Sequence, residues 1–145
     1  MRGVGTEPNP ALIASELRAV LGALVRRLRA ENRLPLSHGA VLARLDREGP
    51  RCVSDLALAE RVRPQSMTQT VADLEGVGYV ARRPDPDDRR RAIVELTAAG
   101  DAALAEERRL REGWLAKAIS EDLTPEQQAV LKDAAELLRL LAESG

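Results

Sequence analysis

The most constraining feature of this sequence is a pair of short helical segments separated by only two residues. Ser54 is a favourable N-cap for a first helix over residues 55–61, and Pro64 suits the start of a second helix over residues 64–75. Three apolar residues at helical spacing predict the buried face of the second helix: Met67, Val71 and Leu74. Two short helices that meet at so tight a turn predict a helix-turn-helix arrangement.

Two strand-like segments, residues 79–83 and 92–96, follow this helix pair. Pro, Asp and Arg fill the segment between them, residues 84–91, and these residue types are typical of turns. The two segments therefore predict a β-hairpin with a charged tip. A helix-turn-helix followed by a two-stranded hairpin is a winged helix, so the sequence predicts a mainly α fold with a small β-hairpin wing.

Helices with one apolar face flank this central part. Their periodicity and capping residues predict them over residues 10–32, 37–48, 98–119 and 125–142. The first and the last helix carry apolar stripes at opposite ends of the chain. These stripes could pack together within one chain, but a chain of 145 residues more often pairs such stripes with a second copy, and we expect a homodimer.

The composition agrees with a helical fold and excludes several classes of protein. The chain has no Phe, one Tyr and one Trp, so Leu, Val, Ile and Ala must fill the core, which favours helices. The net charge of −1 argues against coating nucleic acid by bulk positive charge, but it leaves a local basic patch open. No apolar run approaches the roughly 18 residues of a membrane span, and the N-terminus lacks a signal peptide's apolar stretch. We expect a cytoplasmic protein without membrane contact.

The reactive residues argue against an enzyme. The chain contains one His and one Cys, and it shows no phosphate-loop spacing, no His pair for zinc and no nucleophile elbow. The single cysteine, Cys52, excludes an intramolecular disulfide and fits a reducing compartment. Asp85, Asp87 and Asp88 crowd one turn between arginines, which disfavours a magnesium site. We therefore expect no catalysis, no cofactor and no metal.

The predicted helix over residues 64–75 exposes amides and hydroxyls opposite its apolar face. A glutamine can bond adenine through a donor and an acceptor together, and a serine or threonine can reach a base or a phosphate. Arg61 and Arg63 precede this helix, where they could neutralise phosphates. On an isolated amphipathic helix such residues would be ordinary solvent-facing side chains. The candidate contacts on the helix are Gln65, Ser66, Thr68 and Gln69.

The hairpin tip strengthens the DNA-binding interpretation. Arg89, Arg90 and Arg91 stand in a row, and a narrow A·T-rich minor groove attracts an inserted arginine. Asp88 is positioned in the sequence to orient a guanidinium, so we interpret Asp88 as the wing support and Arg90 as the inserted side chain. The alternative is a charged hairpin end that only resists edge-to-edge pairing of strands.

Taken together, these segments resemble the multiple antibiotic resistance regulator (MarR) family, over about residues 10–142. The run from Leu74 to Gly100 carries most of the resemblance. The matching motifs are Leu36-Ser37, Val41-Leu42-x-x-Leu45, Leu56-Ala57, Leu74-Glu75-x-x-Gly78-Tyr79-Val80-x-Arg82, Asp88-Arg89-Arg90 and Val94-Glu95-Leu96-Thr97-x-x-Gly100. The resemblance implies a homodimeric transcription factor whose two lobes read a pseudo-palindromic operator. It places helix 64–75 in the major groove and Arg90 in the minor groove.

The resemblance also implies how the chain is divided and regulated. It gives dimerisation helices over residues 9–35 and 98–145 and a DNA-binding lobe over residues 36–97, and the polar residues 1–8 before them predict a flexible tail. Many members are repressors released by a small ligand bound between the dimer helices and the lobe. The alternative is a winged helix that contacts another protein instead of DNA.

Three single residues complete the expectations. Oxidant-sensing members carry their cysteine in the first helix, so that role does not transfer to Cys52, and we expect a buried or inert thiol. His38 lies near the start of the second helix and is interpreted as a surface or capping residue. Trp114 is interpreted as a packing residue of the long helix over residues 98–119.

Overall fold

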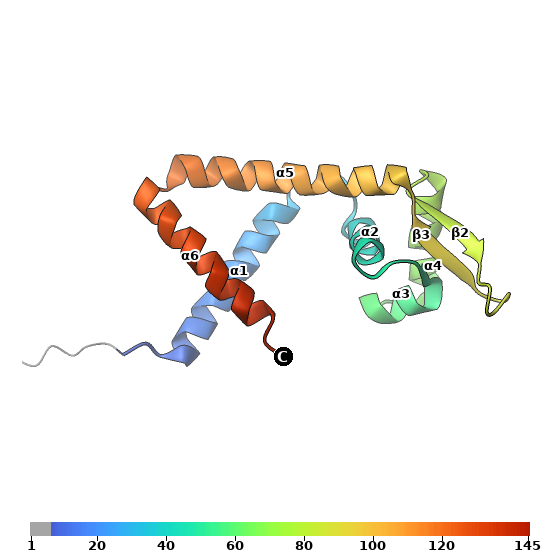
Figure 1. Ribbon diagram of the computed structural model, residues 1–145, viewed down its shortest axis with the longest axis horizontal. Coiled ribbons are helices and arrows are strands. Elements are labelled where there is room, and N and C mark those ends of the chain that lie inside the picture. Colours follow the sequence, from blue (N-terminus) through green and yellow to red (C-terminus); the bar gives the residue numbers. More distant parts are fainter. Residues whose placement is uncertain (1–6) are drawn as a thin grey trace, which may run out of the picture.

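The computed structural model describes residues 7–145, so most of the expected flexible tail over residues 1–8 lies outside the described residues. The mainly helical fold with a winged helix-turn-helix is confirmed (Figure 1). In chain order, the elements are α1 (Pro10–Arg29), α2 (Leu36–Glu48), β1 (Arg51–Cys52), α3 (Val53–Glu60), α4 (Pro64–Gly76), β2 (Val80–Pro84), β3 (Ala92–Leu96), α5 (Ala98–Asp122) and α6 (Pro125–Ala142).

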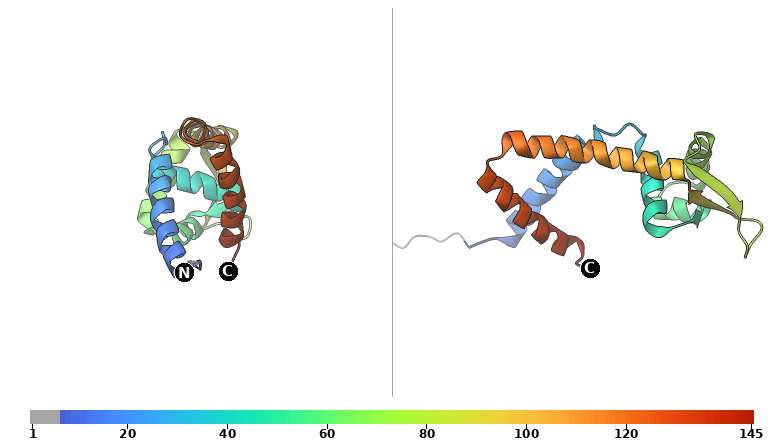
Figure 2. Two further views of the ribbon diagram at one scale, coloured as in Figure 1. Left: turned by 90° about the vertical axis from the view of Figure 1, so that its left-hand side faces the viewer. Right: turned by 45° about the horizontal axis from the view of Figure 1, so that its top comes forward.

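Helix α5 is the spine of the molecule. The helices α2, α3 and α4 and the sheet gather at its N-terminal end, and α1 and α6 lie toward its C-terminal end (Figure 1). In Figure 1, α1 and α6 overlap, but the end-on view in Figure 2 shows them on opposite sides of the molecule. The two apolar stripes therefore do not pack against each other within this chain.

One apolar core holds the winged helix-turn-helix together. Leucine and valine dominate it, as expected for a chain without Phe, and its buried members come from α2, α3, α4, β2, β3 and α5. Leu104 of α5 belongs to this core, so the packing of the lobe continues beyond residue 97. The buried residues are Val41, Leu42, Leu45, Leu56, Ala57, Met67, Val71, Leu74, Val80, Val94 and Leu104.

The sheet has three strands, whereas the sequence predicted a two-stranded hairpin. Residues Arg51 and Cys52 pair antiparallel with Val94 and Ile93, which gives the strand order β1-β3-β2. A segment of two residues is too short to show the alternation by which a strand is predicted. The pairing satisfies backbone groups on the side of β3 that the hairpin would leave open.

Several predicted element ends were also wrong by a few residues. Ser54 is not the N-cap of α3: the cap is Cys52, and Ser54 lies inside the helix with its Oγ 3.2 Å from the Cys52 Sγ. Helix α1 ends at Arg29 instead of residue 32, because residues 30–32 form successive tight turns. Helix α5 continues beyond residue 119 to Asp122, since no helix breaker precedes the next cap.

Two contacts fix the winged helix-turn-helix lobe on α5. The buried carboxylate of Glu107, 5% exposed, accepts hydrogen bonds from the backbone N–H groups of Arg33 at 2.8 Å and Leu34 at 3.3 Å. At the other end, the Thr97 hydroxyl accepts from the Gly100 N–H and donates to the Gly78 carbonyl. A Cβ on Gly100 would lie 2.0 Å from the Tyr79 carbonyl oxygen, so only glycine fits where α5 meets the hairpin.

Candidate nucleic-acid interface

A tight turn sets the angle between α3 and α4. Arg61 adopts the left-handed conformation with φ of 55°. Among the non-glycine residues that the structure describes, it is the one with a positive φ. The N–H of Val62 donates to the Ala57 carbonyl at 3.0 Å and closes the turn. The left-handed conformation is unfavourable by about 1 kcal/mol for residues other than glycine, so Arg61 destabilises the turn locally and the rest of the fold compensates.

An ion-paired arginine fixes the position of α3 against α2. Arg44 Nε of α2 donates to Glu60 Oε1 of α3 at 2.6 Å, and Arg44 Nη1 donates to Glu48 at 2.8 Å. The hydrogen bond to Glu60 raises the pKa of the Arg44 guanidinium above its ordinary value. The first helix of the helix-turn-helix is therefore held by a charged contact as well as by the core.

Helix α4 buries one face and exposes the other. Met67, Val71 and Leu74 are buried, as the spacing predicts. The opposite face has two internal hydrogen bonds: Thr68 Oγ1 donates to the Pro64 carbonyl at 2.9 Å, and Gln69 Nε2 donates to Asp73 Oδ1 at 2.8 Å. The four candidate contacts on this helix are all exposed: Gln65, Ser66, Thr68 and Gln69.

The N-terminus of α4 is electropositive and open. Its N-cap residue, Arg63, makes no side-chain hydrogen bond to the helix, and the first turn contains no acidic residue. Unpaired backbone N–H groups at a helix start attract anions such as phosphate. The exposed side chains of Arg61 and Arg63 lie beside this end and have no ion-pair partner within residues 7–145.

The wing tip exposes one arginine and restrains it from one side. The side chain of Arg90 is 92% exposed, and its Nε lies 3.3 Å from Asp88 Oδ1. The same carboxylate oxygen accepts from the Arg90 backbone N–H at 3.0 Å, and Oδ2 lies 3.8 Å from Arg91 Nε. Asp88 therefore contacts both neighbouring arginines. Arg89 is exposed on the same turn.

Sequence reasoning missed a short polar chain that begins at Gln69. Asp73 Oδ1 accepts from Gln69, and Asp73 Oδ2 lies 3.6 Å from Nε2 of His38, a half-buried residue of α2. The spacing of four between Gln69 and Asp73 signals such a pair on a helix. The approach of His38 could not be predicted, because it depends on how α2 packs against α4.

The other two singled-out residues have packing roles in the structure. Cys52 is buried, as expected, and its Sγ faces the Ser54 hydroxyl. The Arg27 guanidinium of α1 lies over the ring of Trp114 on α5, 4.2 Å from the ring centroid. This cation–π contact joins α1 to α5.

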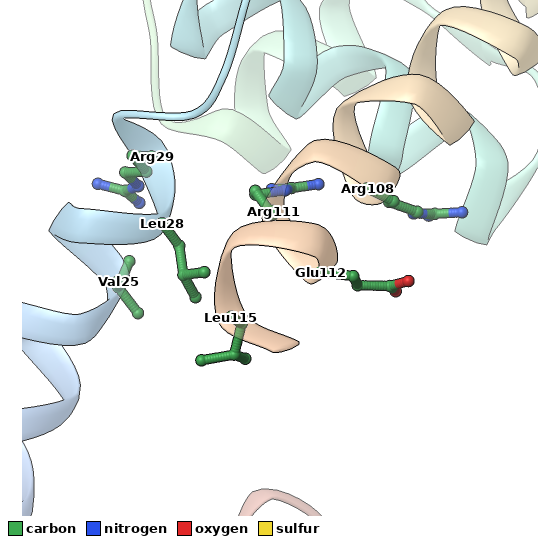
Figure 3. A pocket seen from close by; sticks show the side chains of 7 residues that line it. All are labelled: Val25, Leu28, Arg29, Arg108, Arg111, Glu112 and Leu115. Atoms are coloured by element: carbon green, nitrogen blue, oxygen red, sulfur yellow. The ribbon is translucent and has the colours of Figure 1, made fainter. Parts of the chain in front are cut away.

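A cavity of about 480 Å³ lies between α1 and α5 (Figure 3). Leu28 of α1 and Leu115 of α5 line it from its two sides, and Val25 extends this apolar floor. Arg29 and Arg111 line one side and have no ion-pair partner within the described residues. Arg108 is held by Asp46 at 3.0 Å, and Glu112 points away from the leucines.

The fold and this surface define a winged helix-turn-helix protein, and comparison with known proteins gives its family. The MarR family model matches residues 34–92. The HTH-type transcriptional regulator ML2140 of Mycobacterium leprae is 36% identical over 140 residues, which cover 94% of this chain and 97% of that protein. The transcriptional regulator Tm0710 of Thermotoga maritima has a solved structure that matches with a TM-score of 0.78 at 25% identity. That match covers 89% of this chain and 95% of the other.

A crystal structure of a Pseudomonas aeruginosa PA01 protein, assigned to transcriptional regulation, matches with a TM-score of 0.80 at 33% identity and covers 95% of this chain and 100% of that chain. The chain therefore belongs to the MarR family of DNA-binding helix-turn-helix transcriptional regulators. Within residues 7–145, no helix is long and apolar enough to cross a membrane.

Proposed function

We propose that this protein is a dimeric, cytoplasmic repressor that reads a pseudo-palindromic operator and is released from it by a small molecule. The observation that carries the proposal is the separation of two surfaces along α5. The exposed face of α4 and the wing lie at one end, and two helices with exposed apolar stripes lie at the other (Figure 1). Such a molecule can pair through one end and bind DNA through the other.

In the proposed complex, α4 enters the major groove of each half-site. Gln65, Ser66 and Gln69 face the base edges. The Thr68 hydroxyl, whose proton is donated to the Pro64 carbonyl, accepts a hydrogen bond from a base amino group or from a water bound at a phosphate. Arg63 and the open N-terminus of α4 contact a phosphate on the rim of the groove. The presence of arginine at the left-handed position 61 supports this arrangement. A glycine would adopt this conformation without strain, but it would remove a cation from beside the phosphates.

The wing contacts the adjacent minor groove. Arg90, exposed and held on one side by Asp88, is the residue that inserts. Arg89 and Arg91 flank it and contact phosphates on either side of the groove. Backbone contacts of this kind position the protein, whereas the groove shape contributes sequence preference.

Gln69→Ala tests whether α4 reads bases. In the parent, we expect a strong base preference at one position of each half-site. In the variant, the ratio of affinities for the preferred base and the other bases at that position should fall by about tenfold. Affinity for a duplex of unrelated sequence should change less than about twofold, because phosphate contacts remain. The measurement is competition between labelled operator and duplexes that carry each base at every position. An unchanged preference in Gln69→Ala would exclude the residue from the reading surface.

The cavity between α1 and α5 is the proposed effector site. Its apolar floor fits a hydrocarbon or a ring, and the unpaired guanidinium groups of Arg29 and Arg111 favour an anionic group. The chemistry therefore points to a small carboxylate with an apolar body. Because α1 belongs to the proposed dimer contact and α5 carries the lobe, a ligand between them can change the spacing of the two lobes.

Arg111→Ala tests this site. Benzoate and octanoate, as ring and chain carboxylates, are titrated against the protein–operator complex, and the concentration for half release is recorded by fluorescence anisotropy. Loss of the guanidinium should raise this concentration by about tenfold. Arg109→Ala is the matched control, because Arg109 lies on the same helix but outside the cavity and pairs with Glu106. Equal responses of the two variants, or no release by either carboxylate, would refute the assignment.

A protein-contact winged helix is the second candidate. It shares the fold and would use the wing and α4 to bind a polypeptide instead of a duplex. The exposed arginines at this end favour a polyanion over a neutral protein surface. They are Arg61, Arg63, Arg89, Arg90 and Arg91. Selection of bound duplexes from a random DNA library separates the two candidates, because only the DNA-binding protein should enrich a sequence.

A further inference from the structure

We propose that Asp73 is a specificity-determining residue that fixes the orientation of the Gln69 amide and thereby selects bases that present an amino group in the major groove. The inference rests on the proposed function, since it assumes that Gln69 faces a base in the major groove. It adds a residue that does not itself contact the base.

The contact with Asp73 leaves the Gln69 amide only one favourable orientation. Gln69 Nε2 lies 2.8 Å from Asp73 Oδ1. An ionised carboxylate has acceptor oxygens and no proton to donate. If the amide rotated by half a turn, its oxygen would face the carboxylate oxygen with no hydrogen between them. The amide nitrogen must therefore face Asp73, and the amide oxygen is left for a partner in the groove.

Asp73 is also approached from a neighbouring helix. Its second oxygen, Oδ2, lies 3.6 Å from Nε2 of His38, whose side chain is 20% exposed on α2. Helix α2 packs against α4 through the buried core. The carboxylate is thus contacted by Gln69 of its own helix and approached by His38 of a neighbouring helix, and it offers the amide an acceptor. A polar group with a preferred orientation discriminates better than a freely rotating one, because it loses less conformational entropy when it binds.

The orientation of the amide determines which bases it accepts. In the major groove, adenine and cytosine present amino donors, whereas guanine and thymine present carbonyl acceptors. An outward amide oxygen accepts from an amino donor and repels a carbonyl. Adenine also presents its N7 acceptor to the second N–H of the amide, so adenine should be favoured over cytosine. A free glutamine could rotate and accept guanine or thymine as well.

The test compares two substitutions that remove the same charge from α4. Asp73→Asn replaces the acceptor-only carboxylate by an amide that can donate or accept, so the Gln69 amide can rotate. Glu75→Gln is the matched control: Glu75 pairs with Arg82 at 3.6 Å, and both carboxylate side chains are 46% exposed. Each variant also loses one repulsion toward phosphates, so both should bind any duplex somewhat more tightly.

The readout is relative affinity for operators that carry each of the four bases at the position where Gln69→Ala loses its preference. The parent should prefer adenine there and discriminate against guanine and thymine. In Asp73→Asn, discrimination against guanine and thymine should fall by about tenfold, and Glu75→Gln should keep the preference of the parent. Circular dichroism and thermal unfolding of both variants establish that the helices are intact.

Three results would overturn the inference. A parent preference for guanine or thymine at this position would show that the amide faces the other way. An unchanged preference in Asp73→Asn, or an equal loss in Glu75→Gln, would show that Asp73 does not set it. If the parent bound no duplex selectively, the proposed function would fail and this inference with it, whereas the first three outcomes leave the proposed function standing.

Discussion

Replacement of Arg90 by alanine is expected to weaken operator binding by roughly 100-fold. A groove-inserted arginine is worth about 1–3 kcal/mol, and a dimer uses one from each wing, so a loss of about 1.4 kcal/mol per wing gives two factors of ten. The side chain is 92% exposed and makes no contact with the core, so the fold should not change. The measurement is an anisotropy titration of labelled operator at moderate salt.

Arg83→Ala is the control for this prediction. Arg83 belongs to the same hairpin but lies on β2, where it pairs with Glu95 at 3.2 Å. The substitution removes the same charge from the wing but leaves the arginines of the tip in place. We therefore expect operator affinity to fall by less than about fivefold. Equal operator affinity of Arg90→Ala and the parent would refute the insertion of the wing. The charged tip would then serve only to resist strand pairing.

Leu137→Asp should convert the dimer into a monomer at micromolar concentration. Leu137 is 63% exposed within a single chain and lies in the apolar stripe of α6, so a carboxylate there costs nothing in the monomer. In the proposed dimer the carboxylate would be buried without a partner, which weakens association by about 100-fold or more. Sedimentation velocity over a range of concentrations measures the change. Operator affinity should fall with it, because two linked lobes bind more tightly than one.

Lys132→Asp provides the matching control on the polar face of α6. It introduces the same carboxylate where the helix faces solvent, and the variant should sediment like the parent. A monomeric parent would contradict the dimer directly. A dimeric Leu137→Asp would place the contact elsewhere, for example on α1, whose exposed apolar residues are Leu12, Ile13, Val20, Leu21, Leu24 and Val25.

The order of helices and the wing could be predicted because long periodic patterns and capping residues mark them. Thr97 and Thr124 accept hydrogen bonds from Gly100 and Gln127, as their positions before the helices predict. The third strand could not be predicted, because Arg51 and Cys52 form a strand only through their pairing with β3. Ser54 failed as a cap for the same reason: the pairing carries the chain directly from β1 into α3.

The candidate site was predictable to the level of the exposed face but not to its internal contacts. The helical wheel places Gln65 and Gln69 opposite the core, and the structure has them exposed. The wheel does not show that the Gln69 amide is already bonded to Asp73, or that His38 approaches Asp73 from α2. The left-handed conformation of Arg61 could not be predicted either, since turn propensity alone favours glycine at such a position.

Selection of bound duplexes from a random DNA library, at two salt concentrations, shows whether the protein reads a specific operator as a dimer. We predict enrichment of an inverted repeat with half-sites roughly ten base pairs apart, because two wings and two copies of α4 read DNA from one dimer. Affinity should fall as salt rises, since phosphate contacts release counterions. Binding without an enriched sequence, or no binding at either salt concentration, would contradict a dimeric sequence-reading repressor, and the second result would favour the protein-contact winged helix.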